Sequence, residues 1–169
     1  MSTPDKNLNK GVDLESLSNF KEKVIADVSK ADRRPVMVGV WNGSDEALVS
    51  FDGKQLIIGG ENRLNAMQTL LASFIACDID VVAMHASFIG VKIDELSIEA
   101  SGHFNVQAYI GATDTPGSGF REIKYTIRLK TPEITQEQID FLIERCEKSS
   151  PVGDTLSRSV PLKLEFITS

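Results

Sequence analysis

The sequence contains only two cysteines, Cys77 and Cys146, and it lacks the common short catalytic motifs. No CxxC, HExxH, GxGxxG or P-loop pattern occurs, which disfavours zinc proteases, dinucleotide-binding enzymes and nucleoside triphosphatases. A structural disulfide between two cysteines so far apart is not expected, because reducing compartments keep thiols free. Two alternatives remain for these cysteines: inert buried thiols or redox chemistry.

An excess of positive charge and an apolar leader are also missing. The chain has 18 Lys+Arg against 24 Asp+Glu, a net charge of −6, whereas a nucleic-acid-binding surface is typically basic. Residues 1–16 are polar and contain no signal-peptide core. We therefore expect a cytoplasmic protein without a nucleic-acid partner. The length fits one domain, residues 1–169, in which residues 1–12 form a flexible arm.

Long hydrophobic runs are confined to one stretch, residues 65–90, with Cys77 at its middle. Charged residues interrupt this stretch, whereas a membrane span needs about 20 predominantly apolar residues with few or no charges. We therefore expect no membrane association. A helix that is apolar on most faces belongs in the middle of a globular fold or in a subunit interface.

The region before this stretch has the pattern of one helix followed by three short strands. Apolar residues recur at helical spacing over residues 13–30, where Asp13 is a suitable N-cap. Between the strand candidates, Asn42-Gly43 and Asp52-Gly53 are strong hairpin signals. The strand candidates span residues 36–41, 46–50 and 54–58.

The region after the central stretch predicts two longer strands, two helices and a last strand. Alternating apolar residues indicate strands over 94–110 and 121–130. A capping box at Thr135 opens a helix whose apolar face includes Cys146, and a short helix beginning near a proline follows. A final strand is predicted over 160–167. The order indicates an α+β protein in which an antiparallel sheet covers the central helix, and dimerisation is expected to cover the rest.

Four local motifs, together with this order of elements, give the chain a specific likeness. They are the Gly59-Gly60 turn, the cysteine in LLASFIAC, the segment Gly117–Ile123, and SSPVGDTL at 149–156. In these features the chain resembles the OsmC/Ohr superfamily, the relatives of osmotically inducible protein C and of organic hydroperoxide resistance protein. The resemblance implies an intertwined homodimer with two long central helices under wrapping sheets and a thiol near the interface.

The resemblance also implies a chemistry for Cys77. In the peroxidase members, one cysteine on the central helix attacks a hydroperoxide, and a second cysteine in a Cys-Pro motif resolves the sulfenic acid. Cys77 matches the first position, but Ser150 stands at the second. Cys146 lies about one helical turn earlier and is the candidate for a replacement resolving thiol.

Two further family positions differ. The acidic residue expected near the start of the central helix is replaced by Ala66-Met67, and the strand around Trp41 offers no arginine to hold the thiolate. Arg63 and Arg121 are the candidates for that role. A thiolate needs such a positive neighbour, whereas Asp80 on the helical face of Cys77 disfavours a second negative charge.

Two hypotheses from different classes follow. The first is a thiol-dependent organic hydroperoxide reductase, a cysteine-based peroxidase that uses Cys77 and is completed by Cys146 or an external dithiol. The second is a non-catalytic homodimer of the same fold that binds a small apolar ligand in an interface pocket. Both need neither cofactor nor metal. Because lone buried charges are costly, Asp78 and Asp80 indicate a cavity or salt bridge beside Cys77. The expected pocket residues are Trp41, Phe74, Asp80, Met84, His85, Phe88 and Ser150.

Overall fold

The computed structural model describes residues 8–115 and 117–168. Its first helix is the N-terminal helix that the apolar spacing predicts. Helix α1 spans Leu14–Ala26, and the Asp13 carboxylate caps it by accepting from the Ser16 amide. A short 3-10 turn, η1 (Val28–Ala31), follows. Within the segment expected to be a loose arm, Asn9 is buried and hydrogen-bonded to the chain around Val91.

Three antiparallel strands form the first sheet, in the order β1-β2-β3. The strands are β1 (Val38–Trp41), β2 (Glu46–Phe51) and β3 (Lys54–Gly59). Phe51 pairs with Lys54, so Asp52 and Gly53 form a two-residue turn in which both have positive φ, as Asp-Gly hairpins require. The predicted meander is confirmed.

Helix α2 (Ala66–Phe88) is the central element, as the sequence predicts. Asn65 and Gln68 form a reciprocal capping box that satisfies free backbone groups at its start. In the described part of the chain it is the one helix long and apolar enough to cross a membrane, a criterion that core helices of soluble proteins also meet. Here α2 packs against α3, β4 and α4, which give it a protein environment on one side.

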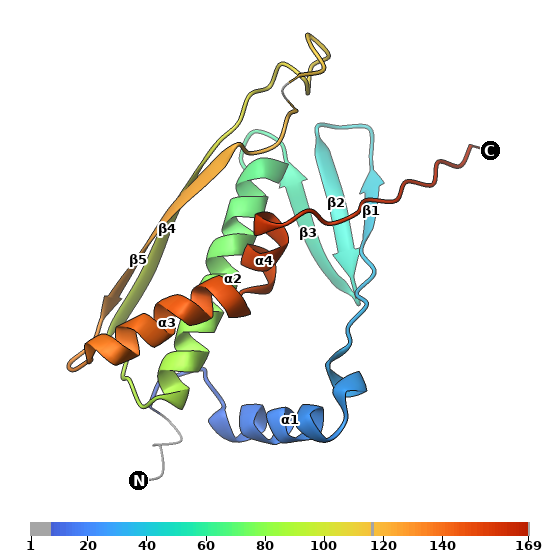
Figure 1. Ribbon diagram of the computed structural model, residues 1–169. Coiled ribbons are helices and arrows are strands. Elements are labelled where there is room, and N and C mark those ends of the chain that lie inside the picture. The colour runs from blue at the N-terminus through green and yellow to red at the C-terminus, as the bar shows by residue number, and fades with distance from the viewer. Residues whose placement is uncertain (1–7, 116, 169) are drawn as a thin grey trace.

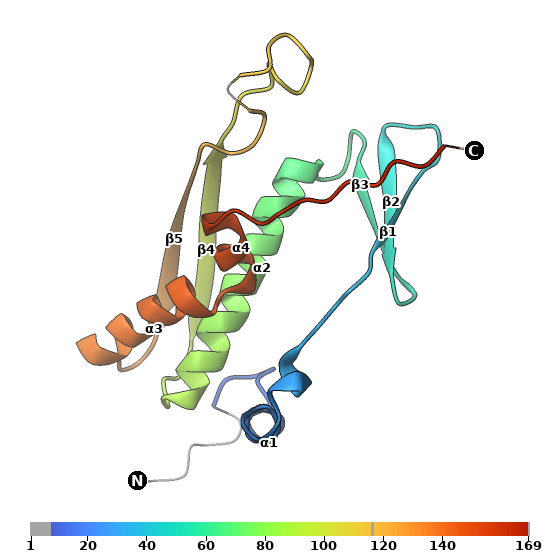
Figure 2. The ribbon, with the colours of Figure 1, turned by 45° about the vertical axis from the view of Figure 1, so that its right-hand side comes forward.

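A second, two-stranded sheet and two helices cover that side of α2. The elements are β4 (Glu95–His103), β5 (Glu122–Lys130), α3 (Gln136–Ser149) and α4 (Pro151–Ser157). In both views α2 lies between the β4–β5 hairpin and the β1–β3 sheet, which are separate sheets (Figures 1 and 2). The mixed architecture of helices and antiparallel sheets that the sequence predicts is therefore confirmed, with two separate sheets in the protomer.

The predicted strand boundaries differ from the structure in two places. The strand expected over residues 94–110 ends at His103, because the chain there leaves the ladder for a long loop that returns at Glu122. The strand expected over residues 160–167 makes no ladder at all. This segment extends away from α4 toward the side of the β1–β3 sheet (Figure 2), it has no ladder partner among the described strands, and Leu162 and Leu164 are 96% and 89% exposed.

The protomer exposes an unusually large surface. Its solvent-accessible area is 13128 Å², whereas a compact chain of 18.5 kDa exposes about 8,200 Å². Many large apolar side chains contribute to this area. A few isolated apolar residues on the surface would be ordinary and would not account for the excess. The excess is therefore a property of the architecture, in which the first sheet, the far side of α2 and the C-terminal segment lack cover.

Candidate functional site

The site begins with the partly exposed thiol of Cys77 at the middle of α2. The hydroxyl of Ser150 lies 3.5 Å from Cys77 Sγ and is positioned to donate a hydrogen bond to the sulfur. Ser150 is held in place because it is the N-cap of α4, where its Oγ accepts from the Gly153 amide at 3.0 Å. The helix cap therefore fixes a hydroxyl against the thiol.

Asp78, next to the thiol in sequence, is the second part of the site. Its side chain has no exposed surface, and both carboxyl oxygens lack a hydrogen-bond partner of ordinary geometry among the described residues. Burial raises the pKa of Asp78, and the nearby Ser150 hydroxyl opposes that rise without reaching a full hydrogen bond. Because an isolated buried carboxylate is costly, the neutral acid is favoured.

The groups that face Asp78 come from β5 and α3. Burial, and next the charge of Asp78, raise the pKa of Tyr125. The pKa of Cys146 is raised to about 11 by burial, by Asp78 and by Glu147. Cys146 is also part of a core cluster with Val81 and Val82, so its thiol is held in apolar surroundings.

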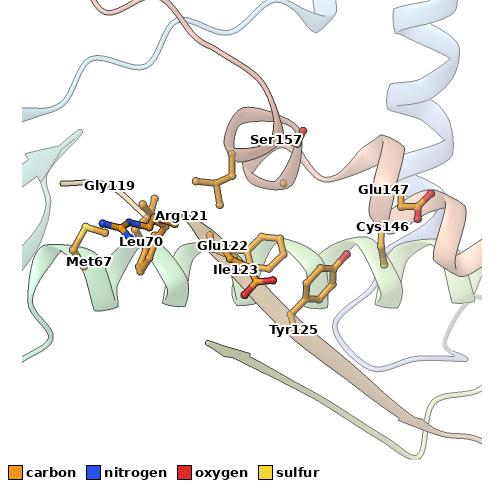
Figure 3. Close-up of a pocket in the computed structure, with 14 residues that line it drawn as sticks. Met67, Leu70, Gly119, Arg121, Glu122, Ile123, Tyr125, Cys146, Glu147 and Ser157 are labelled. Carbon is orange, nitrogen blue, oxygen red and sulfur yellow. The ribbon is translucent and has the colours of Figure 1, made fainter. Parts of the chain in front are cut away.

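A cavity of about 620 Å³ adjoins this cluster on the side of β5 (Figure 3). Met67, Leu70 and Arg121 lie toward one end of it, and Tyr125 and Cys146 lie toward the other. The remaining lining comes from α2, α3, α4, β5 and the loop before β5. Those residues are Phe74, Gly119, Phe120, Glu122, Ile123, Glu147, Gly153, Leu156 and Ser157.

Neither candidate arginine pairs with Cys77. Arg63 forms an ion pair with Glu46 of β2 on the opposite side of α2. Arg121 is exposed and lines the cavity near Met67, at the end away from Cys146. Within the protomer, the thiol is thus surrounded by a hydroxyl and a carboxyl rather than by a guanidinium.

The structure brings only some of the expected pocket residues together. Phe74 and Ser150 lie at the site, where Gly153 packs against both. His85 lies two turns away, in edge contact with the Phe141 ring. Its pKa is lowered by burial and, to a smaller extent, by the positive charges of Arg145 and Lys21. The others are also elsewhere: Trp41 is on the first sheet, Asp80 is exposed, and Met84 and Phe88 are toward the end of α2.

Tyr125 had no specific signal in the sequence. Asp78 was expected beside Cys77 as one of two acids in a cavity or salt bridge, and the structure buries it there without an ion pair among the described residues. Helical spacing places Asp80 on the face of Cys77, yet it is Asp78 that faces α3 and β5. Tyr125 belongs to the apolar set of an alternating strand, and this pattern predicts that its side chain packs in the fold without indicating a role in a site. Among the described residues, no group of three or more His, Cys, Asp or Glu side chains is arranged to hold a metal ion.

Comparison with known proteins gives one family match. A model described as OsmC-like protein matches residues 59–165, which is more than half of the chain. The matched range contains α2, the site cluster and both family positions, Cys77 and Ser150. Curated proteins gave no match.

Solved structures with a similar fold include an OsmC-like protein from Mycoplasma pneumoniae, 20% identical, with a TM-score of 0.64 over 75% of this chain and 89% of that chain. An organic hydroperoxide resistance protein OsmC from Legionella pneumophila is 13% identical, with a TM-score of 0.51 over 73% and 89%. An organic hydroperoxide resistance protein from Elizabethkingia anophelis is 14% identical, with a TM-score of 0.51 over 73% and 87%. At these identities the likeness establishes the fold, and the α+β fold predicted from the sequence is confirmed.

Proposed function

Because the chain belongs to the OsmC-like protein family, we propose that it is a homodimeric reductase of organic hydroperoxides in which Cys77 is the reacting thiol. Two structural neighbours are named organic hydroperoxide resistance proteins. The observation that carries the proposal is the Ser150 hydroxyl, fixed 3.5 Å from Cys77 Sγ. A hydroxyl that donates to sulfur stabilises the thiolate, which is the nucleophilic form.

The oxidising step forms a sulfenic acid. Cys77 thiolate attacks the terminal oxygen of ROOH, the S–O bond forms, the O–O bond breaks, and the leaving alkoxide takes a proton to give ROH. The protein ends as Cys77–SOH. This step needs access to the sulfur, and Cys77 is partly exposed while Cys146 is buried.

The reducing step requires a thiol from outside the chain. Ser150 has no sulfur, and the thiol of Cys146, with a pKa of about 11, is present as thiolate in only roughly one molecule in ten thousand at neutral pH. We assign the reduction to an external dithiol. One thiol displaces water from the sulfenic acid to form a mixed disulfide, and the second displaces Cys77.

Homodimerisation is part of the proposal. It is supported by the excess of exposed surface and by the uncovered alternating segment over residues 160–167. Specific stable interfaces bury about 800 Å² per partner, and obligate ones bury more, so the excess is large enough to supply one. We place the protein in the cytoplasm, where the thiols that the cycle requires are kept reduced.

The test is consumption of cumene hydroperoxide by purified protein with dithiothreitol, measured for the wild type, Cys77→Ser and Cys146→Ser. We expect Cys77→Ser to abolish turnover and Cys146→Ser to retain it within about twofold, since a buried thiol with a raised pKa contributes little. Wild-type turnover no faster than Cys77→Ser for several organic peroxides would contradict the proposal.

A second candidate function rests on the cavity. Its walls are largely apolar, its volume of about 620 Å³ suits a small organic ligand, and Cys77 is not part of the lining. In this alternative the protein binds a small apolar molecule and Cys77 is structural. Native mass spectrometry of the purified protein would then show a bound ligand that is lost in Leu70→Trp, a variant that fills the cavity.

A further inference from the structure

The peroxide reaction requires a proton for its leaving group, and the site contains an unusual source. An alkoxide is a poor leaving group, so proton donation to it in the transition state is worth roughly 100- to 10,000-fold in rate. Cys77 cannot supply this proton, because it must be a thiolate to attack. The donor is therefore expected among the neighbouring groups, as one whose protonated form is favoured in the fold.

Asp78 has the properties of such a donor. It is completely buried, it directly follows Cys77 on α2, and no cation among residues 8–115 and 117–168 forms an ion pair with it. The groups around it are Ser150 before α4, Tyr125 on β5, and Cys146 and Glu147 on α3. None of these is positively charged, so in the described protomer only the Ser150 hydroxyl favours the carboxylate, and the effect of burial on the pKa of Asp78 is the larger one.

Ser150 has the hydrogen-bonding capacity to connect Asp78 with the reacting atoms. A hydroxyl has one proton to donate and two lone pairs to accept with. One lone pair accepts from the Gly153 amide at 3.0 Å, and the proton is directed to Cys77 Sγ at 3.5 Å. The second lone pair is available for the Asp78 O–H, whereas an ionised Asp78 would compete with the sulfur for the single hydroxyl proton.

We propose that Asp78 is the proton donor for the leaving alcohol and that it acts through the hydroxyl of Ser150. The inference rests on the proposed function, since it assigns a role in that reaction. As the O–O bond breaks, Ser150 gives its proton to the alkoxide and Asp78 gives its proton to Ser150. The balance is Cys77–S⁻ + ROOH + Asp78–COOH → Cys77–SOH + ROH + Asp78–COO⁻. Solvent then returns a proton to Asp78 before the next turnover.

The test compares two reactions of the same sulfur in full-length protein carrying Cys146→Ser. Oxidation by cumene hydroperoxide needs a proton for the alkoxide, whereas alkylation by iodoacetamide releases iodide, which needs none. We expect Asp78→Asn to slow single-turnover oxidation at least about tenfold and to leave alkylation within about threefold. In the Cys146→Ser protein with Asp78 intact, the oxidation rate per thiolate should fall as pH rises through the raised pKa of Asp78. This fall should be absent when Asp78→Asn is added.

Two further variants complete the experiment. Ser150→Ala interrupts the connection and also removes the hydrogen bond to Cys77 Sγ, so it should slow both reactions, and it should slow oxidation at least about tenfold more than alkylation. The inference therefore does not depend on one substitution. Asp140→Asn changes an exposed aspartate of α3 and should alter neither rate.

The contradicting results are distinct. Acceleration of both reactions in Asp78→Asn would mean that Asp78 is an anion that merely repels the thiolate. Equal slowing of both would indicate a structural role, and an unchanged oxidation rate would exclude proton donation. If the unsubstituted protein is not oxidised at all, the proposed function itself fails and this inference fails with it.

Discussion

At position 150, a hydroxyl replaces the thiol that the family's peroxidases use, and the exchange can be reversed. Ser150 Oγ lies 3.5 Å from Cys77 Sγ, so small side-chain rotations would bring a sulfur at position 150 within the disulfide bond length of about 2.05 Å. We predict that Ser150→Cys, made with Cys146→Ser, forms an intramolecular disulfide between Cys77 and the introduced thiol on treatment with one equivalent of peroxide. Thiol titration should fall from two to none per chain, and two remaining thiols or only cross-linked dimers would contradict the geometry.

The buried carboxyl of Asp78 predicts a pH-dependent stability. Below about pH 3.9 the carboxyl is protonated in both the folded and the unfolded chain and has no effect. Above that pH the unfolded chain ionises first, because the folded pKa is raised, so this group lowers the free energy of unfolding as pH rises through the window between the two pKa values. Each factor of ten between the acid dissociation constants of the folded and unfolded chain corresponds to a loss of about 1.4 kcal/mol.

The consequence can be measured with Asp78→Asn, which cannot ionise. Urea denaturation of the variant and the wild type between pH 4 and pH 8 should show a difference that grows in favour of Asp78→Asn as pH rises. A difference that is constant with pH, or one that grows in favour of the wild type, would mean that the carboxylate is stabilised in the fold.

The residues of the site differ in how far the sequence could predict them. The sequence identified Cys77 and Ser150 as positions, because short motifs mark them. The sequence does not indicate whether Asp78 or Asp80 is buried, because that depends on α3 and α4, which pack on one face of α2 from about 70 residues away. Helical spacing alone relates residues on one helix and cannot identify the face that a distant element covers.

Among the elements, the junction between α2 and β4 depends on a residue outside both. Asn9 donates to Val91 O and Ser87 Oγ at 2.9 Å each, and its Oδ1 accepts from the Ile93 amide at 2.7 Å. We predict that Asn9→Ala lowers the free energy of unfolding by about 2–4 kcal/mol, because two backbone groups lose their partner. Urea denaturation measures this, and Asn19→Ala on the exposed surface of α1 should stay within about 0.5 kcal/mol. An equal effect of both substitutions would show that the Asn9 hydrogen bonds do not stabilise the junction between α2 and β4.

Local signals predicted most elements of the fold, and long-range pairing limited the rest. The Asp52-Gly53 turn and the capping box at Thr135 act over a few residues, so the sequence alone defines them. The segment over residues 160–167 has the alternation of a strand, yet none of the described strands of the protomer pairs with it. Alternation predicts that one face is to be buried, and it does not identify the chain that buries it.

At the scale of the whole molecule, the uncovered surfaces predict a dimer. Light scattering should give twice the chain mass of 18.5 kDa at micromolar concentration. Leu164→Lys should weaken association at least about tenfold, since burying a leucine contributes about 1.5–3 kcal/mol and each 1.4 kcal/mol is a factor of ten. Leu164 is 89% exposed in the protomer, so its replacement should leave the protomer folded.

The matched control for this substitution is Glu165→Lys, which also introduces a lysine but on the alternate side of the extended segment. It should have the smaller effect on the dissociation constant. A wild-type protein that remains monomeric at all concentrations, or equal effects of the two lysines, would contradict the role given to the C-terminal segment.

The central claim is that Cys77 is oxidised by organic hydroperoxides, and trapping its sulfenic acid tests this most directly. Protein treated with one equivalent of cumene hydroperoxide in the presence of dimedone, then digested and analysed by mass spectrometry, should carry the dimedone adduct on the peptide that contains Cys77. The peptide that contains Cys146 should remain unmodified, because that thiol is buried with a raised pKa. Absence of any adduct at Cys77 while free peroxide persists, or an adduct mainly at Cys146, would contradict the account.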